Sequence, residues 1–457
     1  MATTLSCLSL LPAVGQTPTV QARKIAVQGP SDDGLIEPTI AIGEDIAMVV
    51  ARGGDGSPYY AILDRASDAW VLGGPIAKGS WVGFWDGSVA YDSVTSDFVT
   101  TCYAGQSGSR HVVVSTFDYD TSHANGYGEW SDWQAISPGD PVGDPSIDKP
   151  YMIAGEPGTT AQEYYVVWWH FGSGAYEYRH STDSGANWTG GEIKVGGQSV
   201  TGGFAAQPAV VKEDDFYVAY RKNTTQFRFL VGEDQPSGKL TWAHFLDGCD
   251  EETPILKLNI NLSGSAGSKL PGSFQANSTA QLAADPTSDT RLYVAYHDLA
   301  GSTSTDMNVY VQRLDKHATG WCLGTKVQVN DDTTIFESDQ FLPAITVDEE
   351  GRVHVIFYDD RNYTDGASDI QPDNSANPKF DVYYAYSTNQ GAAWENAELL
   401  ALPAEPALDQ GLQNQDPREY IGIGYEGDVL YGVYTGTSTQ DTQSNKAVIS
   451  ANKITWP

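Results

Sequence analysis

The chain has 457 residues, of which 59 are acidic and 26 are basic, and its formal net charge is −33. This excess of negative charge excludes nucleic acids and anionic membranes, because both are bound through positively charged surfaces. Hydrophobic residues make up 40% of the chain, and 25 tyrosines and 12 tryptophans are available to fill a large core. The sequence contains no apolar run of about eighteen residues, so we expect no membrane-spanning helix.

The sequence divides into a short leading segment and one long domain. Residues 1–20 contain an apolar stretch that lacks the positively charged start of a signal peptide, and we expect a flexible segment or the remnant of a targeting sequence there. This apolar stretch favours an extracellular or cell-surface location. No linker rich in Pro or Ser interrupts residues 21–457, which we expect to form a single domain. Disorder is expected in the loops at 262–278, 364–379 and 403–416.

Seven units of strand-like sequence follow one another along this domain. Short runs of β-branched and aromatic residues alternate with turn residues, and helical periodicity is nearly absent. The units cover residues 37–74, 86–136, 148–188, 206–246, 280–330, 341–394 and 418–456. The third turn or outer strand of each unit carries a tryptophan, namely Trp70, Trp133, Trp188, Trp242, Trp321, Trp394 and Trp456. This repetition predicts an all-β propeller of seven four-stranded blades.

The two ends of the domain are expected to meet. The last unit lacks a convincing outer strand, and the strand-like segment at 22–30 has no partner of its own. We predict that this N-terminal strand completes the last blade, because closing the ring removes the exposed sheet edges.

Two copies of one turn motif, at 181–188 and 387–394, each close a run of strand-like sequence. In the pattern S-x-D-x-G-x-x-W, Asp accepts hydrogen bonds within the turn, Gly supplies a positive φ and Trp covers the hairpin. The second copy has Asn389 where the first has Asp183, which keeps the acceptor oxygen. The motif resembles the Asp-box, or BNR repeat, of sialidase-like β-propellers. Members of that family usually have six blades, so six blades with a capping unit is the alternative.

The four cysteines show no metal-binding spacing. Cys249 and Cys322 fall near the outer edges of adjacent units. Either a disulfide or two buried thiols is expected at these positions.

The propeller topology predicts where a binding site lies. Loops that enter the first strand of each blade and loops that leave the second strand open on one face. Polar and aromatic side chains gather at these positions, which predicts a carbohydrate site, because sugars need polar partners for hydroxyls and aromatic rings for apolar faces. Before the first strands lie Glu37, Asp86, Asp148, Lys149, Gln207, Gln281, Gln340, Arg418, Glu419 and Tyr420. At the ends of the second strands lie Arg52, Trp169, His170, Tyr220, Arg221, His297, Asp298, Asp359, Asp360 and Arg361.

The sialidase resemblance implies a mechanism for this face. In that family three arginines hold the substrate carboxylate, a tyrosine activated by a glutamate attacks, and an aspartate serves as acid and base. Tyr420 and Glu419 would then be nucleophile and activator, with Asp86, Asp148 or Asp359 as the acid. The arginines for the clamp would come from Arg418, Arg361, Arg221 and Arg52.

Two features depart from the sialidase pattern. The F/Y-R-I-P segment that carries the first clamp arginine is missing, and residues 37–40 read E-P-T-I in its place. Glu419 and Tyr420 are neighbours in a strand-like run, so their side chains would point to opposite faces.

A glycoside hydrolase acting on a glycan is the leading expectation, and two other functions stay open. In a polysaccharide lyase, His170, His297 or Tyr220 would act as the base while Arg221 neutralises a uronate, although the acidic chain would repel a polyuronate. In a non-catalytic glycan-binding or surface-assembly propeller, the same residues would only bind. Other expected substrate contacts are Lys149, Gln207, Gln340, Trp169 and Asp298.

No cofactor is required by these expectations, and calcium is an optional ligand. Carboxylate oxygens of the kind that calcium binds occur in two stretches of the chain. Neither stretch has the regular spacing of a calcium loop, so solvated turns are the alternative. The candidate ligands are Asp359, Asp360, Asp365 and Asp369 in one stretch and Asp144 and Asp148 in the other.

Overall fold

A computed structural model describes most of the chain, and every secondary-structure element in the described ranges is a β-strand. These ranges are residues 17–21, 24–27, 35–141, 147–157, 161–203, 206–210, 215–223, 225–234, 239–249, 255–261, 279–300, 306–332, 338–361, 381–399, 421–437 and 447–457. None of them contains a helix with the length and hydropathy that crossing a membrane requires. Outside them lie most of the leading segment and the loops expected to be disordered at 262–278, 364–379 and 403–416.

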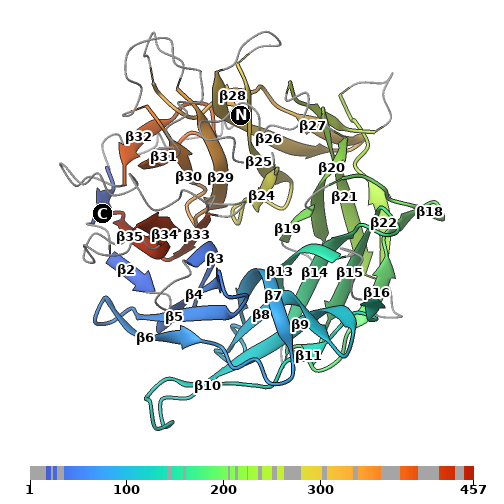
Figure 1. Ribbon diagram of the computed structural model, residues 1–457. Helices are drawn as coiled ribbons and strands as arrows, with labels where there is room; N and C mark the ends of the chain where they lie inside the picture. The colour runs from blue at the N-terminus through green and yellow to red at the C-terminus, as the bar shows by residue number, and fades with distance from the viewer. Residues whose placement is uncertain are drawn as a thin grey trace, which may run out of the picture.

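Seven sheets form a closed ring, and each sheet is one blade of a propeller (Figure 1). Blades 1 to 6 are each built from four strands that follow one another in sequence, with the first strand nearest the centre of the ring. Neighbouring strands pair in antiparallel register. The ring therefore has the seven blades expected from the repeated units, and not six.

The strand bounds follow the repeated units closely. Blade 1 contains β3 (Leu35–Ile42), β4 (Ile46–Gly53), β5 (Pro58–Asp64) and β6 (Ala69–Pro75). Blade 2 contains β7 (Val82–Tyr91), β8 (Phe98–Gln106), β9 (Ser109–Tyr119) and β10 (Gly128–Trp130). Blade 3 contains β13 (Ile147–Pro157), β14 (Gln162–His170), β15 (Ala175–Ser181) and β16 (Thr189–Glu192).

Blades 4 to 6 repeat this order. Blade 4 contains β19 (Ala206–Val210), β20 (Phe216–Asn223), β21 (Gln226–Asp234) and β22 (Leu240–His244). Blade 5 contains β24 (Gln281–Ala284), β25 (Arg291–Leu299), β26 (Met307–His317) and β27 (Gly320–Leu323). Blade 6 contains β29 (Gln340–Val347), β30 (Val353–Asp359), β31 (Asp381–Ser387) and β32 (Glu395–Glu398). Shorter strands are β11 (Gln134–Ala135), β12 (Asp140–Pro141), β17 (Lys194–Val195), β18 (Gln198–Ser199), β23 (Lys257–Asn259) and β28 (Val327–Gln328).

Blade 7 joins the two ends of the described chain. Its strands are β33 (Gly422–Glu426), β34 (Val429–Thr437) and β35 (Ala447–Thr455), followed at the outer edge by β1 (Thr19–Val20) and β2 (Lys24–Val27). β2 pairs with β35 in antiparallel register, with Ile25 opposite Ser450. Between the two N-terminal strands, the Gln21 amide donates to the Lys453 carbonyl at 2.8 Å. The prediction that the segment at 22–30 closes the ring is confirmed.

The core consists of apolar and aromatic side chains held between neighbouring blades. The middle strands are covered on both faces, which is why their sequences read as nearly continuous apolar runs; β30 is buried along its whole length. Rings meet edge to face within and between blades: the Tyr217 centroid lies 5.3 Å from that of Phe245, which follows β22 of the same blade, and 5.4 Å from that of Trp321 in blade 5. Packing between sheets therefore holds the blades in place around the ring.

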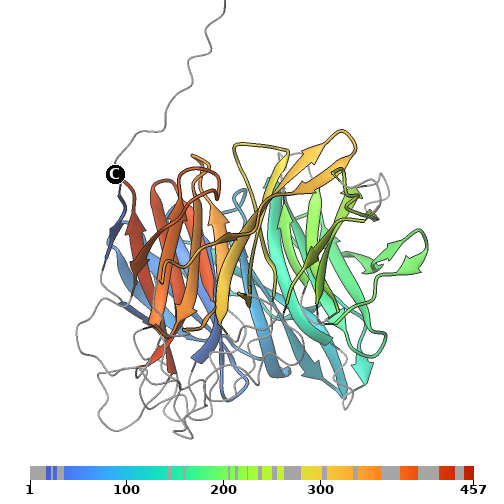
Figure 2. The same cartoon turned by 90° about the horizontal axis from the view of Figure 1, so that it is seen from above.

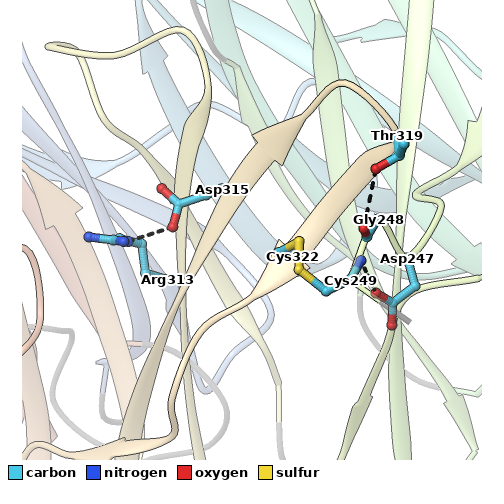
Figure 3. Close-up of a disulfide and its surroundings, with 7 residues drawn as sticks. All are labelled: Asp247, Gly248, Cys249, Arg313, Asp315, Thr319 and Cys322. Atoms are coloured by element: carbon cyan, nitrogen blue, oxygen red, sulfur yellow. Dashed lines mark hydrogen bonds and ion pairs between the residues drawn. A yellow bond between two sulfur atoms is a disulfide. The ribbon is translucent and has the colours of Figure 1, made fainter. Parts of the chain in front are cut away.

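A disulfide between Cys249 and Cys322 joins the outer edges of blades 4 and 5 (Figure 3). Backbone hydrogen bonds accompany it: the Gly248 amide donates to the Trp321 carbonyl at 2.9 Å, and the Trp321 amide donates to the Leu246 carbonyl at 2.8 Å. Of the two arrangements expected for these cysteines, the disulfide is the one present.

The two matching turns connect the third and fourth strands of blades 3 and 6, and both form the same hydrogen bonds. In the first turn, Ser181 Oγ accepts from the Gly185 amide at 2.9 Å, and Asp183 Oδ1 accepts from the Asn187 amide at 2.8 Å. Gly185 has a φ of 83°, which a residue with a side chain rarely adopts. In the second turn the corresponding bonds join Gly391 to Ser387 and Ala393 to Asn389, both at 2.9 Å.

The first strands of blades 1, 2, 3 and 6 share a bulge near their beginning. At each bulge, three residues of the first strand span the length of two residues of the second. A left-handed backbone costs about 1 kcal/mol or more for a residue with a side chain, and bulges of this kind re-aim that side chain. The left-handed residues are Glu37 (φ 59°), Asp86 (50°), Lys149 (51°) and Leu342 (50°).

Candidate functional site

The strand pairing places the expected binding residues on one face of the ring, called here the axial face. In Figure 2 the strands run between the two faces of the ring. The beginnings of first strands and the ends of second strands therefore share one face, while the turns between third and fourth strands lie on the other. The pairs that demonstrate this are Ile36 with Arg52, Asp148 with Trp169, Ala206 with Tyr220, and Gln340 with Asp359.

Blades 1 to 3 bring seven side chains together at the axial face. This blade 1–3 cluster consists of Glu37, Arg52, Trp85, Asp86, Tyr103, Asp148 and Lys149. The charged residues on the three bulges are deeply buried, with exposed fractions of 3% for Glu37, 6% for Asp86 and 3% for Lys149. Burying charge is costly unless each charge is paired. Strained backbone and buried charge together are typical of a binding or catalytic site.

Asp86 and Asp148 form the centre of this cluster. Burial raises the pKa of Asp148 to about 7, and both the charge of Asp86 and a hydrogen bond to it act in the same direction, while Lys149 opposes them. At neutral pH the Asp148 carboxyl therefore holds a proton much of the time, and it is hydrogen-bonded to Asp86. Asp86 also accepts a hydrogen bond from the Lys149 amide at 3.4 Å. A carboxyl group with a pKa near the working pH is suited to act as a general acid.

Trp85 contacts both Arg52 of blade 1 and Tyr103 of blade 2. The guanidinium carbon of Arg52 lies 3.3 Å from the ring centroid of Trp85. Trp85 also stacks on Tyr103, with 6.3 Å between centroids and 5° between ring planes. An Arg52 nitrogen lies 3.9 Å from a Glu37 carboxylate oxygen. Both the cation–π contact and the ion pair therefore hold Arg52 in place.

Burial and the neighbouring carboxylates Asp86 and Asp148 raise the pKa of Tyr103. The phenol therefore remains protonated over the physiological range and is available as a hydrogen-bond donor beside the carboxyl pair.

A second group of charges lies at the axial face where blades 5 and 6 meet. Arg361 Nε donates to Asp359 Oδ2 at 2.8 Å, and Arg361 Nη1 donates to Asp331 Oδ1 at 2.6 Å. The guanidinium carbon also lies 4.1 Å from the centroid of the Tyr383 ring. Burial raises the pKa of Asp359, and Arg361 opposes that shift. Two carboxylates therefore compensate the charge of Arg361.

Asp360 and Asp339 lie beside this group. Burial, followed by repulsion from Asp339, holds the pKa of Asp360 well above its usual range. Asp360 Oδ1 accepts from the Asp339 amide at 2.7 Å, and Asp339 Oδ1 accepts from the Met307 amide at 3.0 Å. These carboxylates thus satisfy backbone amides at the junction of blades 5 and 6.

The proposed calcium ligands have other partners in this arrangement. Asp359 binds Arg361, and Asp360 accepts from the Asp339 amide. Within the described part of the chain, no group of three or more His, Cys, Asp or Glu side chains is arranged to hold a metal ion. The other candidate ligands, Asp144, Asp365 and Asp369, lie outside the described residues.

Expected contacts on blades 3 and 4 are partly in the core. Tyr220 is buried, and its ring meets that of Tyr176 with 5.2 Å between centroids. The Tyr176 hydroxyl donates to the Arg221 carbonyl at 3.0 Å, and burial lowers the pKa of the Arg221 guanidinium. Trp169 and His170, at the end of β14, remain half-buried. These two are the expected contacts of blade 3 that solvent reaches.

Two expected contacts on blade 5 are used inside the protein, one in a bond to blade 6 and one in a bond within blade 5. His297 is fully buried, and its Nδ1 accepts from the Leu342 amide at 3.3 Å. Asp298 accepts from Lys326 Nζ at 2.6 Å. The buried amide side chains among the expected contacts are Gln207 and Gln340.

Arg418, Glu419 and Tyr420 precede β33 and lie outside the described residues. Their roles as clamp, activator and nucleophile stay predictions.

Trp85 and Tyr103 are members of the cluster that sequence reasoning did not anticipate. Trp85 directly precedes Asp86 in the run F-W-D-G, and an aromatic residue next to a candidate acid is the signal that the sequence offered. Tyr103 lies opposite Trp85 in β8. That pairing depends on the bulge between Trp85 and Ser88, which shifts the register by one residue.

Comparison with protein-family models gives no match, and comparison with curated proteins gives none. Solved structures do match in fold. A protein of unknown function from Dyadobacter fermentans has a TM-score of 0.48 at 10% identity, over 96% of this chain and 99% of the other. The fucose-specific lectin of Aleuria aurantia has a TM-score of 0.46 at 13% identity, over 81% of this chain and 99% of the lectin.

Sialidase propellers are among the similar structures. The intramolecular trans-sialidase of Ruminococcus gnavus has a TM-score of 0.43 at 9% identity, over 71% of this chain and 89% of that enzyme. The likeness concerns the fold. The propeller that the resemblance to sialidase-like proteins implied is the fold of this chain.

Proposed function

We propose that this chain is a carbohydrate-active propeller whose blade 1–3 cluster hydrolyses a glycosidic bond. The observation that carries the proposal is the carboxyl pair at the axial face, in which Asp148 has a pKa of about 7 and shares a hydrogen bond with Asp86. Glycoside hydrolases need one carboxyl group that is protonated at the working pH and a second that is ionised.

In the proposed reaction, Asp148 donates its proton to the glycosidic oxygen as the bond between that oxygen and the anomeric carbon breaks. Asp86 keeps the Asp148 carboxyl protonated, through its charge and through the hydrogen bond between the two groups. Glu37 is the carboxylate of the cluster that we assign as the general base. It is 3% exposed and ion-paired with Arg52. It would accept a proton from the attacking water, unless Tyr420 serves as the nucleophile that the resemblance predicts.

The disulfide between Cys249 and Cys322 supports a location outside the reducing cytosol. We therefore place the proposed activity at the cell surface or in the extracellular space, with a glycan as the partner.

Release of an aglycone from a panel of aryl glycosides tests the proposal. Purified protein should release the aglycone from at least one member, and Asp148→Asn should lower kcat/KM by a factor of roughly 100 or more, as expected for loss of a general acid. Asp120→Asn is the matched control, because Asp120 is an exposed acceptor in the turn after β9, on the opposite face. The activity of wild-type protein should fall as the pH rises through 7, where Asp148 loses its proton.

Two results would count against hydrolysis. Equal activity of wild type and Asp148→Asn would remove Asp148 from the reaction. Glycan binding without turnover by any member of the panel would instead assign the chain to the non-catalytic glycan-binding propellers.

A further inference from the structure

The charges of the blade 1–3 cluster balance one another inside the protein. Glu37 contributes one negative charge, and the hydrogen-bonded Asp86–Asp148 pair contributes one more when Asp148 carries its proton. Arg52, 3.9 Å from Glu37, and Lys149, beside the carboxyl pair, contribute one positive charge each. The sum is zero. An anionic ligand would bring a further negative charge into a buried site whose cations already face carboxylates, which is costly.

The described arginines expected to clamp a ligand carboxylate come from three blades that are not neighbours, and two of them are paired with carboxylates of the protein. Arg52 belongs to blade 1, Arg221 to blade 4 and Arg361 to blade 6, so other blades separate them around the ring (Figure 1). Arg361 is held between Asp359 and Asp331, and Arg52 is held by Glu37. These two arginines are therefore already compensated by carboxylates of the protein, and a ligand carboxylate would compete with those carboxylates for them.

A second group of carboxylates lies elsewhere on the axial face. Asp339, Asp359 and Asp360 gather where blades 5 and 6 meet, and repulsion among these carboxylates helps to raise the pKa of Asp360. Across the whole chain, acidic residues exceed basic ones by 59 to 26. A field of this sign lowers the local concentration of anions and slows their arrival at the site.

We propose that the blade 1–3 cluster takes a neutral saccharide, and that it discriminates against sugars bearing a carboxylate, sulfate or phosphate. Hydroxyl groups of the ligand donate hydrogen bonds to Glu37 and Asp86 and accept hydrogen bonds from Arg52 and Lys149. Each hydroxyl can therefore act as both donor and acceptor. This inference rests on the proposed function of the same cluster and names its substrate class. It separates the chain from sialidases, whose substrate carries the carboxylate that three arginines hold.

The test uses matched pairs of oligosaccharides that differ only at C6, with a hydroxymethyl group in one member and a carboxylate in the other. Gluco, galacto and manno pairs, together with sialylated and asialo galactosides, are titrated against the full-length protein by calorimetry. A neutral member should bind at least 10-fold more tightly than its carboxylate partner. Raising the salt concentration should leave neutral binding unchanged and improve the weaker carboxylate binding, because salt screens the repulsion.

Glu37→Gln removes one negative charge from the cluster and should reduce the preference for the neutral member at least threefold. Asp120→Asn should leave it unchanged, and thermal unfolding of each variant establishes that it is folded. Where Glu37→Gln fails to fold, Asp86→Asn provides the same test. Tighter binding of a uronate, a sialoside or a cationic amino sugar than of the neutral partner would overturn the neutral-ligand inference and leave a glycan site in place. Absence of binding and turnover for every sugar would overturn the proposed function itself.

Discussion

The surroundings of Asp148 disfavour its ionised form, so this residue lowers the stability of the folded protein at neutral and alkaline pH. Its pKa is 3.8 as an ordinary carboxyl and about 7 in the folded protein. Since the folded state binds the proton more tightly than the unfolded state, its contribution to stability is fully present below pH 3.8 and is lost as the pH rises toward 7. A carboxyl pair that disfavours the folded state at neutral pH persists where function depends on it.

Asp148→Asn should therefore stabilise the protein at alkaline pH while abolishing the proposed activity. At pH 8 the variant is expected to exceed wild type by up to about 4 kcal/mol in free energy of unfolding, because each pKa unit corresponds to about 1.4 kcal/mol. At pH 3.5 the two proteins should be equally stable. Urea unfolding at both pH values measures this difference, and a gap that does not change with pH would refute the raised pKa of Asp148.

The two matching turns use different acceptors for the same backbone hydrogen bond, a carboxylate in blade 3 and an amide in blade 6. Asp183 accepts from both the amide and the side-chain nitrogen of Asn187, at 2.8 and 2.7 Å. Asn389 accepts from the Ala393 amide at 2.9 Å. A charged acceptor makes the stronger bonds. The turn of blade 3 therefore depends more on its acceptor than the turn of blade 6.

Replacing these acceptors should separate the two turns. Asp183→Ala is expected to cost about 2 kcal/mol and Asn389→Ala about 1 kcal/mol, in line with the net value of charged and neutral hydrogen bonds. Asn389→Asp should change the free energy of unfolding by less than about 0.5 kcal/mol, because the acceptor oxygen is retained. Chemical denaturation of the three variants gives the values. A larger loss in Asn389→Ala than in Asp183→Ala would contradict this ranking.

Strands and turns could be predicted from the sequence, but the bulges could not. Alternating aromatic and β-branched runs, together with the Trp-marked turns, specify where each strand lies because both are local signals. The left-handed residues Glu37, Asp86 and Lys149 precede Pro or Gly, which permits a bulge without requiring one. What selects the bulge is the fit between neighbouring blades, as when Ser88 Oγ of blade 2 accepts from the Met152 amide of blade 3 at 2.8 Å.

At the scale of the whole molecule, the disulfide closes a loop that contains parts of two blades. Cys249 and Cys322 are 73 residues apart in sequence. The backbones of blades 4 and 5 approach closely beside the disulfide. A Cβ added to Gly320 would lie 2.4 Å from the Leu246 carbonyl oxygen, and Gly320 has a φ of 147°. Only glycine allows the two edges to approach this closely. The covalent bond and the backbone contacts therefore stabilise the same junction.

The double variant Cys249→Ser, Cys322→Ser should lose about 4 kcal/mol of stability, the loop-closure value for a loop of this length. Reduced wild-type protein should lose a similar amount, and adding a reductant to the double variant should have no further effect. Urea unfolding with and without dithiothreitol provides the comparison. Glycan binding should survive in the double variant, because the blade 1–3 cluster lies in other blades. Equal stability of the oxidised wild type and the double variant would contradict a stabilising role for the bond.

The closure of the ring could be predicted from the sequence. The segment at 22–30 lacks a partner and the last blade lacks an outer strand, and pairing the two removes both exposed edges. The site could be predicted only in part. Topology brings Arg52, Asp86, Asp148 and Lys149 to one place because blades 1 to 3 are neighbours. Arg221 and Arg361 belong to blades 4 and 6, which are not neighbours of blade 1. Residues can therefore lie on the same face of the ring without contacting one another.

Closure by the N-terminal strand also means that the ring cannot close until the C-terminal strand β35 has been synthesised. The side-chain amide of Asn452 donates to the Gln21 carbonyl at 2.9 Å, across a sequence separation of 431 residues. At translation rates of about 5–20 residues per second, β2 emerges roughly 20–90 seconds before the strand it pairs with exists. During that interval blades 1 to 6 can form in succession while β2 lacks its partner. The propeller therefore completes its ring only when β35 has been made and pairs with β1 and β2.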